Sequence, residues 1–237
     1  MSVVELRQYT LRPGARETLI ELFEREFVVG QQAVGITVGG RFRDLDDPDR
    51  FVWLRAFPDM AHRRRALEAF YTGPVWREHR DAANATMVDS DDVLLLRGPG
   101  FTPAPGAREV FATVCHPADA AAFDAYAARH LNPGNALHRT EHAENDFPRL
   151  PVRTGEEARV WFGPAEPPPW PAGRLRLEPV ARPPAGGPVS PARPSGTGSL
   201  SAAQGTSRLF RCVKSYFRTH SCDLLGDQSI STTIVSV

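Results

Sequence analysis

The chain has 237 residues, 41% of them hydrophobic, and a formal net charge of zero. This length suits one large domain or two domains of roughly 100 residues each, and the neutral balance excludes a global field that would recruit nucleic acid or an acidic membrane. Three scattered cysteines, Cys115, Cys212 and Cys222, exclude a disulfide framework, and the N-terminus lacks the apolar run of a signal peptide or membrane span. We therefore expect a cytoplasmic protein.

The first hundred residues predict one compact arrangement of strands and helices. Apolar residues recur with a period of two in the strands and at helical spacing in the helices. The predicted elements are a strand at 3–11, a helix between Gly14 and Gly35, strands at 36–43 and 51–57, a helix from Asp59 to Gly73, a short helix with Trp76, and a strand at 92–97. This order predicts a ferredoxin-like module, with a four-stranded antiparallel sheet and helices on one face.

The second half repeats parts of the first. Glu109–Pro117 has the spacing of Glu5–Pro13, and Val160–Phe162 resembles Val52–Leu54 at a similar offset. A helix at 119–130, a hairpin at 136–162 and a strand at 174–180 complete the copy, whereas the prolines of 163–173 exclude a second helix. We predict an α+β fold of two tandem ferredoxin-like modules, 1–100 and 101–182, packed as a barrel.

Composition changes near the C-terminus. Residues 1–194 contain three serines and no lysine, whereas 195–237 contain nine serines and the only lysine, Lys214. The stretch 181–198 is rich in proline and glycine, which is typical of a linker. We expect a linker and disordered tail at 183–237, and we hypothesise that the last part, from about residue 195, is not native sequence.

Polar side chains on two strands indicate a ligand site. Glu5, Arg7 and Tyr9 share one face of the first strand, and Trp53 and Arg55 share one face of the central strand. We expect this face to be the one that the module's own helices leave open, so that these side chains line a pocket between the two sheets. The two arginines would hold a carboxylate or phenolate. The simpler reading, which we favour, is a structural pair of Arg7 or Arg55 with Glu5.

His79 and Tyr9 are the candidate catalytic residues. His79 lies one helical turn from Trp76 and next to Arg80, so it is a candidate general base beside the pocket. Trp76 and Arg80 are therefore added to the predicted pocket. The alternative for His79 is a partly buried helix residue that a backbone carbonyl satisfies.

Three other stretches carry weaker signals. His138–His142 matches H-x-x-E-H, but zinc binding requires a stable helix where we predict a strand, so we expect no metal, and we expect no cofactor. Arg63–Arg65 is read as a solvated helix face. In Asn145–Arg153, either Phe147 covers the barrel mouth or the prolines make a rigid loop that fixes how the modules dock, and we favour the second.

Four motifs resemble the NIPSNAP family of the dimeric α+β barrel superfamily. They are E-L-R-Q-Y-T-L-R-P-G from Glu5, F-V-W-L-R-A-F with R-R-R-A-L, V-W-R-E-H-R at Val75, and N-D-F-P-R-L-P-V-R at Asn145. The resemblance implies paired ferredoxin-like modules that form a barrel, often dimeric, with little characterised biochemistry; the wider superfamily includes cofactor-free oxygenases. At Trp53, Arg55 and His79 the family pattern favours His, Trp and Tyr instead.

Three functions follow from these observations. The first is a binding or assembly protein with a small-molecule ligand and no nucleic-acid or membrane partner; the resemblance implies a homodimer. The second is a cofactor-independent oxygenase or isomerase that acts on an aromatic or polyketide-like ligand through Tyr9 and His79. The third is a metallohydrolase through His138 and His142. We favour the first, because no group of residues supplies both a base and an electrophile.

Overall fold

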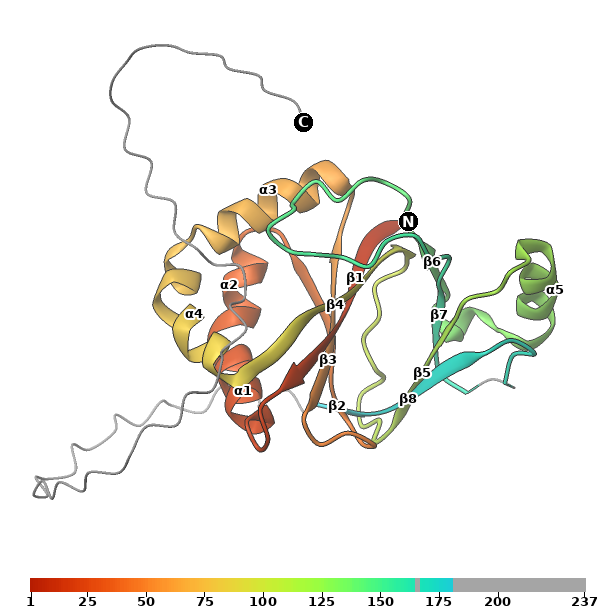
Figure 1. Ribbon diagram of the computed structural model, residues 1–237, viewed down its shortest axis with the longest axis horizontal. Coiled ribbons are helices and arrows are strands. Elements are labelled where there is room, and N and C mark those ends of the chain that lie inside the picture. Colours follow the sequence, from red (N-terminus) through yellow and green to blue (C-terminus); the bar gives the residue numbers. More distant parts are fainter. Residues whose placement is uncertain (165–166, 181–237) are drawn as a thin grey trace, which may run out of the picture. The chain divides into compact units, whose positions relative to one another are not determined.

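The computed structural model describes residues 1–164 and 167–180, and the predicted tail at 183–237 lies outside them. In these ranges eight strands form a closed barrel in the order β1-β3-β2-β8-β5-β7-β6-β4 (Figure 1). The strands are β1 (Ser2–Leu11), β2 (Thr37–Asp44), β3 (Arg50–Phe57), β4 (Met87–Gly98), β5 (Val110–Cys115), β6 (His138–Thr140), β7 (Arg159–Phe162) and β8 (Ala172–Pro179).

The barrel consists of two four-stranded sheets with the same internal order. The first sheet runs β4-β1-β3-β2 and the second runs β8-β5-β7-β6, which is the antiparallel order of a ferredoxin-like module in both cases. Two short seams join the sheets: Phe42–Asp44 pairs with Leu177–Pro179, and Leu96 and Arg97 pair with Thr140 and Arg139. The predicted fold class is confirmed, whereas the exact module limits, 1–100 and 101–182, stay predictions.

Helices cover the outer face of each sheet. They are α1 (Arg16–Leu22), the π-helical turn η1 (Phe23–Phe27), α2 (Val28–Ala33), α3 (Met60–Tyr71), α4 (Pro74–Thr86), α5 (Ala120–His130) and the short 3-10 turn η2 (Pro133–Asn135). Asp59 begins α3 as predicted, because its Oδ1 accepts a hydrogen bond from the His62 backbone N–H at 2.6 Å. Between β7 and β8 the described residues contain no helix, so the second module lacks its second helix.

Two features of the first helical layer differ from the prediction. The helix between Gly14 and Gly35 is interrupted by the π-helical turn η1, which the apolar spacing did not reveal because Phe23 and Phe27 also fit an α-helix. The helix α4 extends over 13 residues from Pro74 to Thr86, and β4 follows it at once from Met87. The fourth strand of the first sheet and the last helix that covers this sheet are therefore both longer than predicted.

The barrel interior is apolar and is built by both modules. Its buried side chains are Val4, Leu6, Phe42, Val52, Leu54, Ala56, Leu94, Leu96, Val110, Ala112, Val114, Ala158, Val160, Phe162 and Leu177. Phe101, from the segment between the modules, stacks on Phe162 with ring centroids 4.1 Å apart and also contacts Phe42. Because the two seams are short, this shared apolar packing is the main contact that holds the barrel closed.

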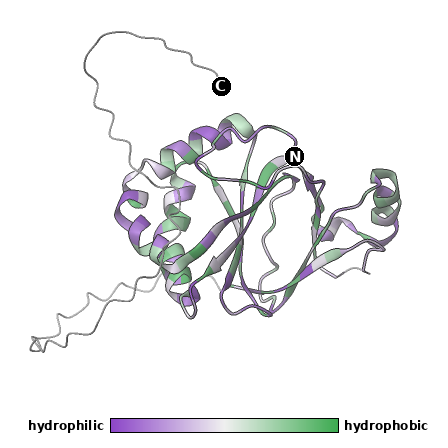
Figure 2. Cartoon of the chain, viewed as in Figure 1, coloured by the Kyte–Doolittle hydropathy of each residue, from purple (hydrophilic) through white to green (hydrophobic). Residues whose placement is uncertain are grey.

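α5 forms a separate apolar layer outside the second sheet. Phe123 and Tyr126 pack there against Cys115 and Trp161. Figure 2 shows α5 largely in the hydrophobic colour, in keeping with its alanine-rich sequence. Within the described ranges, no helix has the length and apolar character needed to cross a membrane.

The barrel also encloses one titratable ring, His138. Its side chain is fully buried, and Nε2–H donates to the Pro99 carbonyl oxygen at 2.6 Å. Burial lowers the pKa of His138 below the usual value of 6.5. The folded protein therefore keeps this ring neutral at a pH where the unfolded chain protonates it.

We expect acid to weaken the fold through His138. As the pH falls from about 6.5 towards the lower folded-state pKa, the unfolded chain binds a proton that the folded protein does not, so the free energy of unfolding decreases. Urea unfolding between about pH 8 and pH 5 should show this decrease, and His138→Gln should flatten it. His142→Gln is the matched control because His142 is exposed; an equal flattening in that variant would contradict the assignment.

Candidate functional site

The predicted site residues lie on the helix-covered face of the first sheet, not between the two sheets. Tyr9 and Trp53 belong to the core that α1, η1, α3 and α4 build with this face, whereas the neighbouring Leu6 and Leu54 point into the barrel. The prediction that these residues lie between the two sheets was wrong. Both faces of these strands are buried, and the alternation of residues shows which side chains share a face but not which face lies inside the barrel. The closed barrel takes the purely apolar face.

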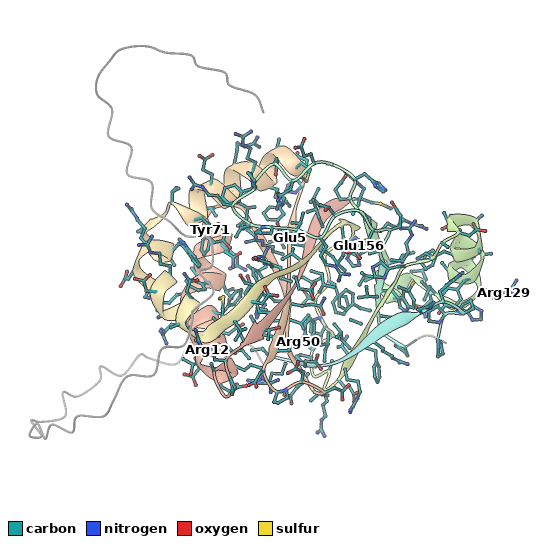
Figure 3. The ribbon with its side chains drawn as sticks, in the orientation of Figure 1. Glu5, Arg12, Arg50, Tyr71, Arg129 and Glu156 are labelled. Atoms are coloured by element: carbon teal, nitrogen blue, oxygen red, sulfur yellow. The ribbon has the colours of Figure 1, made fainter. Side chains whose placement is uncertain are left out.

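Three arginines surround the carboxylate of Glu5, which Figure 3 labels on β1. Arg7 Nη1 lies 2.6 Å from Glu5 Oε2, and Arg55 Nε donates to the same oxygen at 2.7 Å. Arg63 Nε, from α3, donates to Glu5 Oε1 at 2.7 Å. The four side chains are fully or almost fully buried. The favoured structural pairing of Arg7 or Arg55 with Glu5 is therefore confirmed, and we call these four residues the arginine cluster.

The arginine cluster carries more positive than negative charge. Burial alone would raise the pKa of Glu5, but Arg55, Arg7 and Arg63 together hold it well below its usual range, so this carboxylate stays ionised. Three guanidinium groups then face one carboxylate in the fully buried part of the site. Buried charge of one sign is costly without a partner, so the site favours a further anion.

Arg63 has one donor to spare. Its Nη1 donates to Asp146 Oδ1 at 2.7 Å and to Asn145 Oδ1 at 3.0 Å, while the buried Nη2 has no hydrogen-bond partner among the described residues. The reading of Arg63–Arg65 as a solvated face was wrong for Arg63. The signal was available, because Arg63, Leu67 and Phe70 fall on one helical stripe at i, i+4 and i+7.

Aromatic side chains flank the guanidinium groups. The Trp53 ring lies near both Arg7 and Arg55, whose Cζ atoms are 5.8 and 5.4 Å from its centroid, and its buried Nε1 has no partner in the described structure. Tyr9 Oη accepts a hydrogen bond from Arg7 Nε at 3.0 Å. Burial raises the pKa of Tyr9 against the opposing effect of Arg7, so its hydroxyl stays protonated and can donate.

A loop from the second module closes the site. Residues 141–153, here called the roof loop, run from β6 to α3 and back (Figure 1). Its two ends hydrogen bond to β4, from Glu141 N to Leu95 O and from Arg153 N to Val93 O. In its middle the Phe147 ring stacks on Tyr71, with centroids 6.0 Å apart and planes 28° apart.

The roof loop combines the two roles that we had set as alternatives, at a different place. Phe147 is buried as a cover, but it covers the helix-lined arginine cluster instead of the barrel mouth. Leu150 packs into the same core. The loop therefore also ties the second module to the first, through apolar contacts as well as through the Arg63–Asp146 ion pair.

A cavity of about 540 Å³ lies between the roof loop and β4. Leu95 forms part of its wall and is the strand neighbour of Glu5, and Asn145 forms another part and accepts from Arg63. This cavity is therefore adjacent to the arginine cluster.

The remaining predicted pocket residues lie apart from the arginine cluster. Trp76 is buried against Tyr71 and Phe27 in the helical layer. His79 is partly buried, with Nε2 3.6 Å from Glu26 Oε2, and Arg80 is exposed beside Asp81. The structure thus brings together Glu5, Arg7, Tyr9, Trp53 and Arg55, but it does not bring His79 or Arg80 to them.

The H-x-x-E-H stretch is not a helix. His138 begins β6 and points into the barrel, whereas His142 is exposed and lies 3.5 Å from Glu157. The two imidazoles therefore face different environments and share no metal position. Across the described ranges, no three His, Cys, Asp or Glu side chains gather in a way that would hold a metal ion.

The second module carries no copy of the arginine cluster. Thr113 pairs with Trp161 as Arg7 pairs with Trp53, so Phe111, and not Glu109, takes the position of Glu5. The register thus differs by two residues from the spacing that revealed the repeat. A shift of two residues leaves each side chain on the same face of the strand, so the repeat could still be recognised from the sequence. The predicted equivalence of Glu109 with Glu5 was wrong.

Part of the chain is similar to a known protein family. Residues 4–103 match the model of the NIPSNAP family. This part of the chain is similar to a NIPSNAP domain. It comprises the first module, from β1 through β4, and hence Glu5, Arg7, Arg55 and Arg63. No curated protein matches the chain.

Several solved structures are similar to the chain. An uncharacterised NIPSNAP-like domain protein from Burkholderia xenovorans is 28% identical over 44% of this chain and 90% of its own length, with a TM-score of 0.38. A NIPSNAP family protein from Agrobacterium tumefaciens is 18% identical over 44% and 98%, with a TM-score of 0.39. A proposed monooxygenase from Fusobacterium nucleatum is 7% identical over 76% and 93%, with a TM-score of 0.51, which shows a shared fold alone.

Proposed function

We propose that this protein binds a small organic anion at the arginine cluster, between the first sheet and its helices. The observation that carries the proposal concerns Nη2 of Arg63. This nitrogen is buried in a site with excess positive charge, and it has no acceptor among the described residues. Arginine binds carboxylates with two parallel hydrogen bonds where its geometry allows. The ligand would therefore present a carboxylate or a comparable oxyanion to Arg63.

The aromatic surroundings support an organic ligand over an inorganic one. Tyr71 offers a ring face below the roof loop, and the protonated Tyr9 and the unpartnered Trp53 Nε1 are further donors near the guanidinium groups. Binding sites for small molecules commonly combine apolar walls with a few such polar groups. The cytoplasmic location and the homodimer stay predictions.

Calorimetric titration tests the proposal. Benzoate and hexanoate should bind to the full chain, whereas the uncharged benzamide should not, and Arg63→Gln should weaken binding by roughly tenfold or more because the forked contact is lost. Arg159→Gln is the matched control: Arg159 is a buried arginine of the second module that pairs with Glu157. Arg63→Lys keeps the charge without the fork and should bind with intermediate affinity.

Two results of the titration would refute the proposed site. Carboxylate binding that is unchanged in Arg63→Gln, or absent from the wild-type protein, would refute the site. The thermal midpoint of each variant, measured alongside, shows that the variant is folded before its affinity is compared.

The second candidate is a cofactor-independent oxygenase or isomerase, and the Arg7–Tyr9 contact favours it. A protonated phenol held by a guanidinium can deliver a proton or hydrogen bond to a bound enolate or phenolate. The same panel, extended to 4-hydroxybenzoate and other phenols under oxygen, separates the two candidates. Turnover that disappears in Tyr9→Phe while binding persists would favour catalysis.

A further inference from the structure

We infer that the roof loop occupies its own ligand site, with Asp146 and Phe147 in the places of the carboxylate and ring of an aromatic carboxylate, and that such a ligand binds by displacing them. This inference rests on the proposed function. The Asp146 carboxylate accepts a hydrogen bond from Arg63, and the next residue, Phe147, stacks on Tyr71. A charge and a ring joined by a short flexible linker describe an aryl-substituted short-chain acid such as 3-phenylpropionate.

Arg63 makes two ion pairs that differ in their exposure to solvent. Its contact with Glu5 is fully buried, whereas its contact with Asp146 is partly open, because the Asp146 side chain is 23% exposed. Ion pairs that reach solvent contribute little to stability and exchange readily with other anions. The Glu5 contact therefore fixes the orientation of Arg63, and the Asp146 contact is the one that a ligand can replace.

A free carboxylate can also bind Arg63 better than Asp146 does. Asp146 uses Oδ1 on Nη1 alone, and Nη2 is left without an acceptor. A ligand carboxylate is not tied to the loop backbone, so it can approach both Nη1 and Nη2 and form the forked pair. The ligand thus gains one hydrogen bond that the internal contact lacks.

The middle of the roof loop can be displaced while the two ends of the loop stay attached to the barrel. Its ends remain attached to β4 through the backbone bonds of Glu141 and Arg153, and residues on both sides of its middle line the cavity of about 540 Å³. Movement of the middle of the loop therefore need not break the barrel. The cavity and the vacated surface of Tyr71 would together receive the ligand.

The test compares 3-phenylpropionate with hexanoate in the wild-type protein and three variants. Asp146→Asn removes the internal competitor and should tighten 3-phenylpropionate by about threefold to tenfold, since a site that is less often self-occupied has a higher apparent affinity. Asp124→Asn is the matched control, because Asp124 is an exposed acid paired with Arg139 at 2.6 Å and the charge change is equal. Phe147→Ala should raise the affinity for 3-phenylpropionate more than that for hexanoate.

Hydrogen exchange gives a readout that a charge effect alone would not move. Saturation with 3-phenylpropionate should speed amide exchange at Phe147 and Leu150, whose N–H groups are bonded inside the roof loop. Binding that depends on Arg63 but slows this exchange, with Asp146→Asn equal to Asp124→Asn, would overturn the inference and leave the proposed function intact. No Arg63-dependent binding in any variant would overturn both.

Discussion

Glu5→Gln should lower the free energy of unfolding by about 3–5 kcal/mol, because it removes the only fully buried carboxylate between Arg7, Arg55 and Arg63. The amide retains the size of the side chain but not its charge, so Arg7 and Arg55 would lose their carboxylate partner in the described site and Arg63 would keep only Asp146. Urea unfolding at pH 7, monitored by tryptophan fluorescence, measures the change.

Glu17→Gln is the control for this experiment. Glu17 also pairs with an arginine, Arg43, at 2.6 Å, but its side chain is 54% exposed. Its removal should therefore change stability by no more than about 1 kcal/mol. If the two variants were destabilised equally, the arginine cluster would not have the energetic weight that its burial indicates.

Phe162→Ala should destabilise the protein by a comparable amount, about 3–5 kcal/mol, since it opens a cavity in the barrel interior. Phe162 is fully buried and stacks on Phe101, which in turn contacts Phe42 of the first module. The ring therefore belongs to a stack that crosses the barrel from one module to the other. Its loss should weaken both modules, not the second alone.

Fluorescence can separate the two modules in this experiment. Trp53 and Trp76 lie in the first module and Trp161 and Trp170 in the second, so variants that retain tryptophan in one module report on that module. Both reporters should show the same lowered transition. The control is Phe111→Ala, on the outer face of β5, where Arg174 covers a partly exposed ring. A drop confined to the second module's reporter would contradict shared packing.

The sequence predicted the elements of the first module well because its strands and helices carry clear periodicity. β1, β3 and α3 were found close to their observed bounds, with Asp59 as the cap. The pairing of Arg7 and Arg55 with Glu5 also followed from sequence, since neighbouring strands bring such residues together. Local pattern was sufficient wherever the contact lies within one sheet.

The rest of the site depends on contacts that no local pattern encodes. Arg63 and Asp146 are far apart in sequence, and the roof loop has no periodicity that would indicate its partner. The covered face of β1 was misassigned because it is buried whichever way the sheet turns. The polar residues were recognised from sequence, but their neighbours from α3 and the second module were found only in three dimensions.

The two seams between β2 and β8 and between β4 and β6 close the barrel inside one polypeptide. A barrel assembled from two identical chains would hold two identical sites, and selection could not alter one without the other. Here the two halves are covalently joined and encoded separately: the second half has Phe111 and Thr113 where the first has Glu5 and Arg7, and it supplies the roof loop to the first. The proposed anion site therefore occurs once per barrel in the described residues, and saturation should follow a simple hyperbola with one ligand per barrel.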